Sequence, residues 1–210
     1  MGICYIVGAG DCRESFLPKE GDLVIAADGG ALHLSRMGVR PDLFVGDFDS
    51  IDSAGDAPVV LRHPVEKDDT DTALAVRAGE ARGYREFFLY GALGGERFDH
   101  SVANLQLLLS CAKRGLSVTI VSGKQRTRVL RAGETLTFSA AARGFISVFA
   151  FGCEAQGVTL SGLKYPLRDA TLSPDCPLGV SNEFIGEACE IRAKRGHLLV
   201  IWQENGGEDR

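Results

Sequence analysis

The stretch LVIAADGGALHLSRMGVRPDLFV, residues 23–45, decides the fold class of this chain. Its apolar run over residues 23–27 predicts a buried strand, residues 31–37 predict a helix, and residues 43–45 predict a second strand. Two strands joined through a helix are typical of a parallel sheet, because a parallel pair needs a crossover connection. The stretch therefore predicts an α/β fold.

The same alternation continues on both sides of this stretch. Helices are expected over about residues 70–82, ending at Gly83, and about residues 99–114, with Asp99 as a possible cap and Gly115 at the end. The second helix presents apolar residues at 102, 103, 105, 108 and 109. Further strands are expected over residues 3–7, 59–61, 86–90 and 117–121. We expect a mostly parallel sheet that binds ligands outside the carboxyl ends of its strands.

After residue 123 the helical period disappears. Short apolar runs separated by turn residues predict strands over residues 128–130, 135–138, 145–149, 158–160, 170–172, 188–192 and 198–202. Strands of this length and spacing are typical of an antiparallel sandwich or barrel. We therefore expect two domains, residues 1–123 and residues 124–210.

Composition and charge exclude several classes of protein. Hydrophobic residues make up 45% of the chain and charged residues 24%, as in ordinary globular proteins, and no apolar run approaches the span of a bilayer. The run over residues 3–7 is too short for a signal peptide and lacks a basic segment before it, so a cytoplasmic location is expected. The net charge of −5 argues against a broad nucleic-acid surface, and six cysteines without a CxxC pair argue against structural zinc.

Two carboxylates lie one residue apart in the motif GDFDS, residues 46–50. Asp47 and Asp49 can reach a single point from an extended loop, and Mg²⁺ takes oxygen ligands of this kind together with water and phosphate. The alternative is an Asp-rich turn, since Asp forms local hydrogen bonds in loops.

A second acidic group, Lys67-Asp68-Asp69-Thr70-Asp71, precedes the helix expected near residue 70. Acidic side chains stabilise a helix start, and Thr70 or Asp69 could cap it, which accounts for one or two of these acids. Asp71 is the preferred third metal ligand and Asp68 the second choice. Lys67 could bind phosphate or only offset the local charge.

Two glycine-containing turns follow predicted strands. Asp28-Gly29-Gly30 could bring backbone amides close to a phosphate or nucleotide, and equally could be a strand-to-helix turn capped by Asp28. The loop GALGGERFDH, residues 91–100, carries Arg97, whose guanidinium could clamp phosphate oxygens or form a surface salt bridge. In the second half, the segments SGLKY, residues 161–165, and VSNEF, residues 180–184, read as loops suited to hold a small ring, or as packed loops.

Together these motifs resemble the thiamine pyrophosphokinase family of the bacterial type. The resemblance runs in order along nearly the whole chain: Asp28-Gly29-Gly30, Pro41-Asp42 with residues 46–50, residues 67–71, 95–100, 162–165 and 181–184. It implies an α/β fold in which an N-terminal Rossmann-like, mostly parallel sheet with helices binds ATP and Mg²⁺. A C-terminal antiparallel β-sandwich would bind thiamine, and a homodimer would have its active sites at the subunit interface.

The family resemblance also implies a reaction and a set of site residues. The diphosphoryl group of ATP would pass to the hydroxyethyl oxygen of thiamine, giving AMP and thiamine diphosphate. Asp47, Asp49 and Asp71 would hold the metal and act in catalysis with Arg97. The remaining residues implied as ATP contacts are Asp28, Gly29, Gly30, Lys67, Asp68, Thr70, Asp99 and His100, and those implied as thiamine contacts are Tyr165, Ser181 and Asn182.

Two other functions are compatible with parts of this pattern. A related pyrophosphokinase acting on another heterocyclic alcohol, such as a pterin, would have the same acidic loops and a different C-terminal pocket. A non-catalytic nucleotide or thiamine sensor would lack the metal-binding acids, and all of them are present here. Asp71 or Asp49 could accept the proton of the hydroxyl group, although a carboxylate bound to Mg²⁺ is a poor base.

Overall fold

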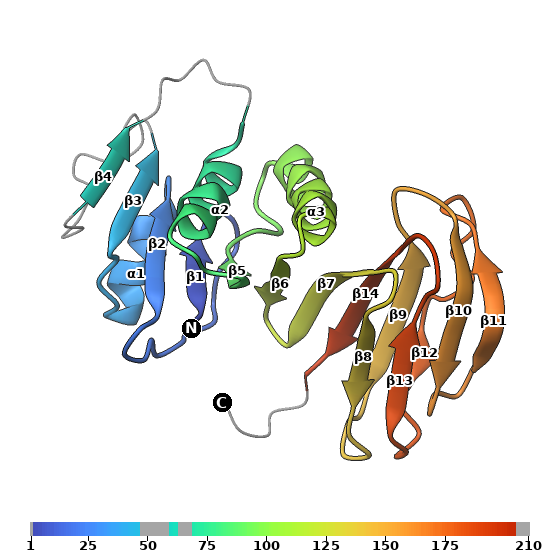
Figure 1. Cartoon of the computed structure of the whole chain (residues 1–210). Coiled ribbons are helices and arrows are strands. Elements are labelled where there is room, and N and C mark those ends of the chain that lie inside the picture. Colours follow the sequence, from blue (N-terminus) through green and yellow to red (C-terminus); the bar gives the residue numbers. More distant parts are fainter. Residues whose placement is uncertain (1, 47–58, 63–68, 205–210) are drawn as a thin grey trace. The chain divides into compact units, whose positions relative to one another are not determined.

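The computed structural model describes residues 2–46, 59–62 and 69–204, and for residues 59–62 the backbone alone. It contains two compact units (Figure 1). The first comprises residues 1–107 and 115–123, and the second comprises residues 108–114 and 124–210. The assignment of ATP binding to residues 1–123 and of thiamine binding to residues 124–210 stays a prediction.

The first unit is built on a parallel sheet. Its strand order is β6-β5-β1-β2-β3-β4, and the neighbouring strands within this set pair in parallel. The prediction of a mostly parallel sheet is therefore confirmed. The strands are β1 (Cys4–Val7), β2 (Leu23–Ala27), β3 (Leu43–Gly46), β4 (Val59–Arg62), β5 (Glu86–Tyr90) and β6 (Ser117–Ser122).

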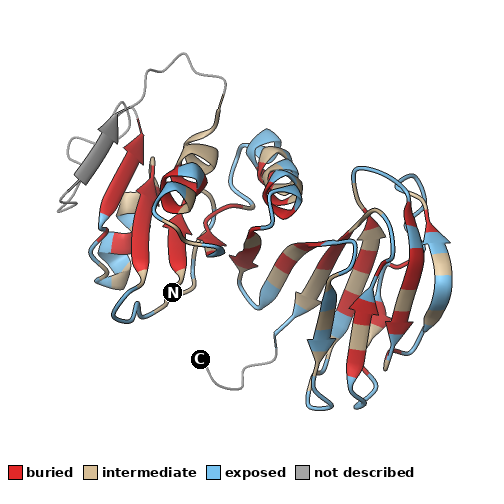
Figure 2. Ribbon diagram, viewed as in Figure 1, coloured by how far each residue is buried: buried red, intermediate tan, exposed pale blue. Residues whose placement is uncertain are grey.

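Helices α1 (Gly30–Met37) and α2 (Asp71–Ala81) pack against opposite faces of this sheet. Alternate strand residues such as Tyr5 and Phe44 form one core cluster with Leu34 of α1. The other face meets α2, where a Cβ added at Gly79 would lie 2.7 Å from the ring of Phe87 and 2.9 Å from the sulfur of Cys4. Both faces of β1, β2 and β3 are therefore buried, as Figure 2 shows.

The third helix, α3 (Phe98–Lys113), begins one residue before the expected start. Asp99 is its second residue and is not its cap, so the predicted cap is wrong. The expected apolar face is also displaced, because Val102 is 40% exposed. The residues of α3 that are buried follow a helical spacing and include two polar side chains: Ser101, Asn104, Leu108, Cys111 and Ala112.

The second unit contains two groups of antiparallel strands, and the first has the order β12-β9-β14-β7. A separate sheet has the order β11-β10-β13-β8 and is also antiparallel. The strands are β7 (Gln125–Arg131), β8 (Thr135–Phe138), β9 (Phe145–Ala150), β10 (Ala155–Ser161), β11 (Leu167–Leu172), β12 (Asn182–Glu183), β13 (Cys189–Arg192) and β14 (His197–Gln203).

Strand β12 corrects an expectation, because residues 180–184 were predicted to be a loop. Asn182 and Glu183 pair with Ile146 and Phe145 of β9 in an antiparallel ladder. A pair this short leaves no periodic pattern in the sequence, which is why the strand was missed. Within the described residues no helix is long and apolar enough to cross a membrane, and all six cysteines are free thiols.

Candidate active site

The carboxyl ends of three parallel strands carry glycine-containing turns, and two of these turns, residues 28–30 and 91–95, belong to segments predicted to contact phosphate or nucleotide. Because the strands run in the same direction, the turns after β1, β2 and β5 emerge at one edge of the sheet. Those turns are the segments at residues 8–10, 28–30 and 91–95. The parallel pairing therefore gathers three glycine-containing segments that are far apart in the sequence.

Glycine at these turns is required by close backbone contacts. A Cβ at Gly30 would lie 1.8 Å from the carbonyl oxygen of Val7, and a Cβ at Gly10 would lie 2.7 Å from that of Gly91. Gly91 itself has φ +58°, a left-handed conformation that favours glycine. Backbone hydrogen bonds from Gly8 N to Tyr90 O and from Gly10 N to Gly91 O, both 2.8 Å, join the first and third turns. The edge of the sheet is thus formed by packed main chain.

Asp28 adopts a left-handed conformation, with φ +50°, at the end of β2. Its backbone N–H donates to Val45 O at 2.9 Å, which ties the turn to β3. The N-cap of α1 is Gly29, which has no side chain to cap the helix. The alternative in which Asp28 caps the helix is therefore wrong. The half-buried carboxylate lies at the edge predicted to bind the nucleotide.

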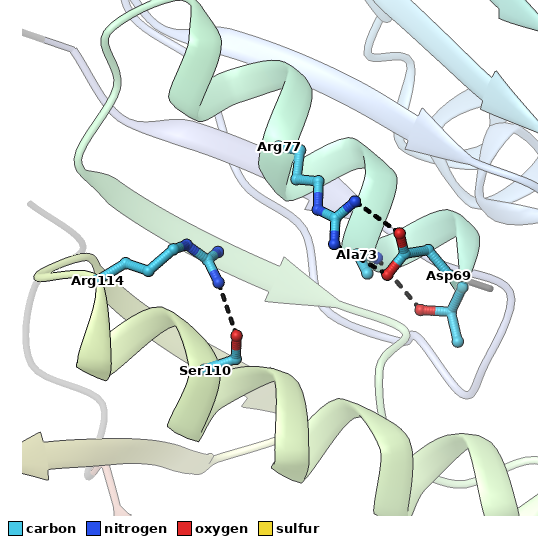
Figure 3. A network of polar contacts seen from close by, with 6 residues as sticks. Asp69, Ala73, Arg77, Ser110 and Arg114 are labelled. Atoms are coloured by element: carbon cyan, nitrogen blue, oxygen red, sulfur yellow. Dashed lines mark hydrogen bonds and ion pairs between the residues drawn. The ribbon is translucent and has the colours of Figure 1, made fainter.

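At the start of α2, Thr70 and Asp69 each make a local contact. Thr70 is the N-cap, and its hydroxyl accepts a hydrogen bond from Ala73 N at 3.2 Å. Asp69 forms a two-point ion pair with Arg77, with contacts of 2.6 and 3.1 Å (Figure 3). These two contacts account for Thr70 and Asp69 as local structure. Asp71 lies in the first turn of α2 and is half-buried.

Arg97 and Asp99 form an exposed ion pair at the start of α3. Two nitrogens of the guanidinium donate to the two carboxylate oxygens, at 3.0 and 2.6 Å. The hydrogen bond from Arg97 lowers the pKa of Asp99 to about 2. Both side chains are more than 60% exposed, and His100 is exposed as well. The surface salt bridge foreseen as an alternative is therefore present, in an orientation that leaves the guanidinium accessible to solvent.

Three side chains near this edge were not singled out from the sequence. Asn104 of α3 donates to Ala92 O at 2.7 Å, and Ser101 accepts from Gly94 N at 3.1 Å. Nε2 of His33, on α1, lies 2.9 Å from Gly10 O, while its buried Nδ1 has no hydrogen-bond partner among the described atoms. The sequence signal for the first two is a polar residue within the buried stripe of a helix.

Four predicted site residues, Asp47, Asp49, Lys67 and Asp68, lie outside the described residues. Within the described part of the chain no group of three His, Cys, Asp or Glu side chains is arranged to hold a metal ion. Asp28 and Asp71, two of the carboxylates that the structure describes at this edge, are hard oxygen donors, and this chemistry fits Mg²⁺ better than a transition metal.

The second unit brings together Tyr165 and Asn182. Asn182 is 2% exposed, and its side-chain amide pairs with both backbone groups of Tyr165. Oδ1 accepts from Tyr165 N at 2.9 Å, and Nδ2 donates to Tyr165 O at 2.7 Å. Oδ1 also accepts from Glu183 N at 2.9 Å. The amide therefore fastens the turn at residues 162–165 to β12.

A cavity of about 190 Å³ lies beside this pair of residues. Its walls are mainly apolar, and the Tyr165 side chain, in a residue 58% exposed, forms part of its lining: Leu160, Tyr165, Leu167, Leu178, Gly179, Val180 and Asn182. Ser181 is exposed, with φ +56°, and its backbone N–H donates to the hydroxyl of Ser147 at 3.0 Å. The predicted ring-binding residues Tyr165, Ser181 and Asn182 are therefore neighbours in one unit.

Both halves of the chain match models of known protein families. Residues 16–120 match the family model described as "Thiamin pyrophosphokinase, catalytic domain". Residues 135–198 match the model described as "Thiamin pyrophosphokinase, vitamin B1 binding domain". The first match contains Asp28, Asp71 and Arg97, and the second contains Tyr165 and Asn182.

Individual relatives agree with these matches. A curated thiamine pyrophosphokinase of Bacillus subtilis (strain 168) is 29% identical over 188 residues, 87% of each chain. The crystal structure of thiamine pyrophosphokinase from Bacillus subtilis is similar with a TM-score of 0.84 and 26% identity, covering 97% of this chain and 100% of that one. The corresponding structure from Geobacillus thermodenitrificans has a TM-score of 0.78 and 30% identity, covering 98% and 99%. With both of its halves matched in order, this chain belongs to the thiamine pyrophosphokinase family.

Proposed function

We propose that this protein is a thiamine diphosphokinase, which transfers the diphosphoryl group of ATP to the hydroxyethyl oxygen of thiamine and releases AMP. The observation that carries the proposal is the pairing of the two matched domains in one chain. The glycine turns and the acids of the first unit suit a polyphosphate, and the apolar cavity of the second suits a small ring. Formation of thiamine diphosphate from ATP follows from membership of the family.

The phosphate half of the site is proposed to lie at the carboxyl edge of the parallel sheet. Arg97 would bind phosphate oxygens, because a guanidinium offers two parallel N–H donors to such a group. Asp28, Gly29 and Gly30 would contact the nucleotide, and the edge formed by packed main chain would keep these contacts in place. Lys67, Asp68, Thr70, Asp99 and His100 complete the proposed ATP contacts.

Magnesium is part of the proposal, held by Asp47, Asp49 and Asp71. When bound, the ion would neutralise charge on the phosphate oxygens. The oxygen chemistry of Asp71, the proposed ligand that the structure describes, supports this choice. Asp47→Asn or Asp49→Asn should cost far more in turnover than in stability. Unchanged turnover in a folded Asp49→Asn protein would count against the role of that residue.

The thiamine half is proposed to lie at the cavity in the second unit. The cavity of about 190 Å³ has room for a small ring. Tyr165 would lie against the thiamine, and the attraction of its face for the cationic thiazolium is worth about 0.5–2 kcal/mol. Ser181 and Asn182 would hydrogen-bond the pyrimidine. Asn182 uses one N–H of its two on Tyr165 O, so at most one remains for the substrate.

The protein's main contribution to this chemistry would be positioning. Diphosphoryl transfer needs the hydroxyl oxygen in line with the β-phosphorus and the moving charge neutralised, and little covalent help. Arg97 would stabilise negative charge on the transferred group. Asp71 or Asp49 would accept the proton of the hydroxyl group, although a carboxylate is a weaker base while it binds the metal.

The finer architecture belongs to the same proposal. We infer a Rossmann-like first domain, and a second domain in which two sheets form a sandwich. The sandwich is supported by one core cluster that draws Ile146, Val148 and Val200 from one group of strands and Leu160 and Ile191 from the other. A cytoplasmic homodimer with active sites at the subunit interface is proposed on the strength of the family resemblance.

Phosphorus NMR of ATP, Mg²⁺ and thiamine with the protein tests the proposed reaction. AMP appearing together with thiamine diphosphate supports it. ADP would indicate single-phosphoryl transfer, and no turnover would favour a sensor. Replacing thiamine with a hydroxymethyl pterin in the same assay tests the rival substrate, which should give no diphosphate product. The oligomeric state follows from sedimentation equilibrium of the full chain.

A further inference from the structure

The glycine-rich loop over residues 91–95 is held from two sides. On one side, the backbone bonds Gly8 N to Tyr90 O and Gly10 N to Gly91 O fix its beginning. On the other, two side chains of α3 reach back to it: Ser101 accepts from Gly94 N and Asn104 donates to Ala92 O. The loop leads directly into Arg97 two residues later.

The loop's own residues provide little to keep its backbone in one conformation. Gly91, Gly94 and Gly95 all have positive φ, between +58° and +78°, and glycine loses the most conformational freedom on folding. None of the three has a side chain to pack. Contacts from outside the loop must therefore supply its order, and the two α3 side chains are contacts of this kind.

We propose that Asn104 and Ser101 are positioning residues for the phosphate-binding loop and, through it, for Arg97, with Asn104 the more important of the two. The inference rests on the proposed function, because it takes the loop and Arg97 to bind ATP. Neither residue touches the substrate in this scheme. Each acts by fixing the backbone from which Arg97 extends.

The burial of the two partners explains why Asn104 should matter more. Asn104 is 6% exposed and Ala92 is 4% exposed, so water cannot easily replace the lost donor when the amide is removed. A buried carbonyl without a partner carries its full desolvation cost. Gly94 is exposed, so water can accept from its N–H once the Ser101 hydroxyl is gone.

The test compares Asn104→Leu, Asn104→Asp and Ser101→Ala, assayed well below their melting temperatures. Asn104→Leu keeps the approximate shape and removes the donor, and kcat/KM for ATP should fall at least about tenfold, while KM for thiamine changes by less than about twofold. Ser101→Ala should lose less than Asn104→Leu. An effect of Ser101→Ala equal to or larger than that of Asn104→Leu overturns the ranking.

Asn104→Asp provides a conservative variant with a distinct pH dependence. Its ionised carboxylate would repel Ala92 O, whereas the protonated acid could donate to it, and burial favours the protonated form. Activity of this variant relative to wild type should therefore rise as pH falls. Asn104→Leu should show no such rise, and the same pH profile in both variants contradicts the proposed hydrogen bond.

Val118→Ala is the control for plain loss of stability. Val118 is 3% exposed on β6 and pairs with Phe87 near the start of β5, at the end of that strand away from the loop at residues 91–95. It should lower the melting temperature and leave both KM values unchanged. If Asn104→Leu only lowers the melting temperature, as Val118→Ala does, the residue is structural and the inference is wrong.

Hydrogen exchange in the ligand-free protein separates this inference from the proposed function. Mass spectrometry should show faster exchange over residues 91–97 in Asn104→Leu than in wild type or Val118→Ala. Absence of that increase in a folded variant overturns the positioning role, whatever the activity. Absence of thiamine diphosphate from wild-type assays overturns the proposed function instead.

Discussion

Replacing Asn182 with Ala should destabilise the second unit and weaken thiamine binding together. The side-chain amide makes three hydrogen bonds, two to the backbone of Tyr165 and one to that of Glu183, and it is 2% exposed. At a net 0.5–1.5 kcal/mol for each bond, the free energy of unfolding should fall by about 1.5–4.5 kcal/mol. The loss should free the turn that carries Tyr165 and so lower the affinity for thiamine.

Urea denaturation and calorimetric titration with thiamine measure the two effects separately. Ser181→Ala is a matched control, because Ser181 is the adjacent residue and is exposed. It should weaken thiamine binding, if its hydroxyl contacts the pyrimidine, without changing the unfolding midpoint. Asn182→Ala with wild-type stability and weakened binding would show that the amide serves the substrate and not the turn, and would refute the reasoning.

The remaining predictions concern the first unit. Gly30→Ala should fail to fold, seen as insoluble protein, because its Cβ would lie 1.8 Å from a carbonyl oxygen of β1. Thr70→Ala should lower the free energy of unfolding by about 1 kcal/mol in urea denaturation, and Thr70→Ser should restore it, because Thr70 caps α2. The carboxyl of Asp99 should titrate by NMR with a pKa of about 2, and Arg97→Ala should return it toward 3.8. Because the folded pKa is depressed, any stability from the pair is present above pH 3.8 and is lost as pH falls through about 2. An unshifted Asp99 would show that the pair does not form in solution.

The bounds of an element could be predicted best where turn-forming residues mark its ends. Strands β2, β5 and β8 begin and end at the predicted residues, since turn-forming residues flank β2 and glycine follows β5 closely. Helix α2 ends before Gly83, as predicted, for the same reason. Strand β12 was missed because two residues show no alternation, and their pairing with β9 is a tertiary effect.

Which residues of the candidate site could be predicted also depends on how clearly the sequence marks them. Residues that would touch a ligand directly, such as Asp71 and Arg97, could be predicted because they occur in or next to loops of unusual composition. Capping is harder to assign, because Asp28 and Asp99 both have the right chemistry, and only the backbone shows that Gly29 caps α1 and that Asp99 lies inside α3.

The loop-holding contacts of Asn104 and Ser101 could have been predicted from the periodicity of α3. The buried stripe of α3 runs through residues 101, 104, 108, 111 and 112, and its first two positions are polar. A polar side chain on such a stripe needs a hydrogen-bond partner, because burying it alone is costly. The loop that precedes the helix is the nearest segment with backbone groups to offer. When a glycine-rich loop precedes a helix and the buried face of that helix begins with polar residues, the sequence therefore predicts that the helix holds the loop. This prediction does not depend on the identity of the ligand.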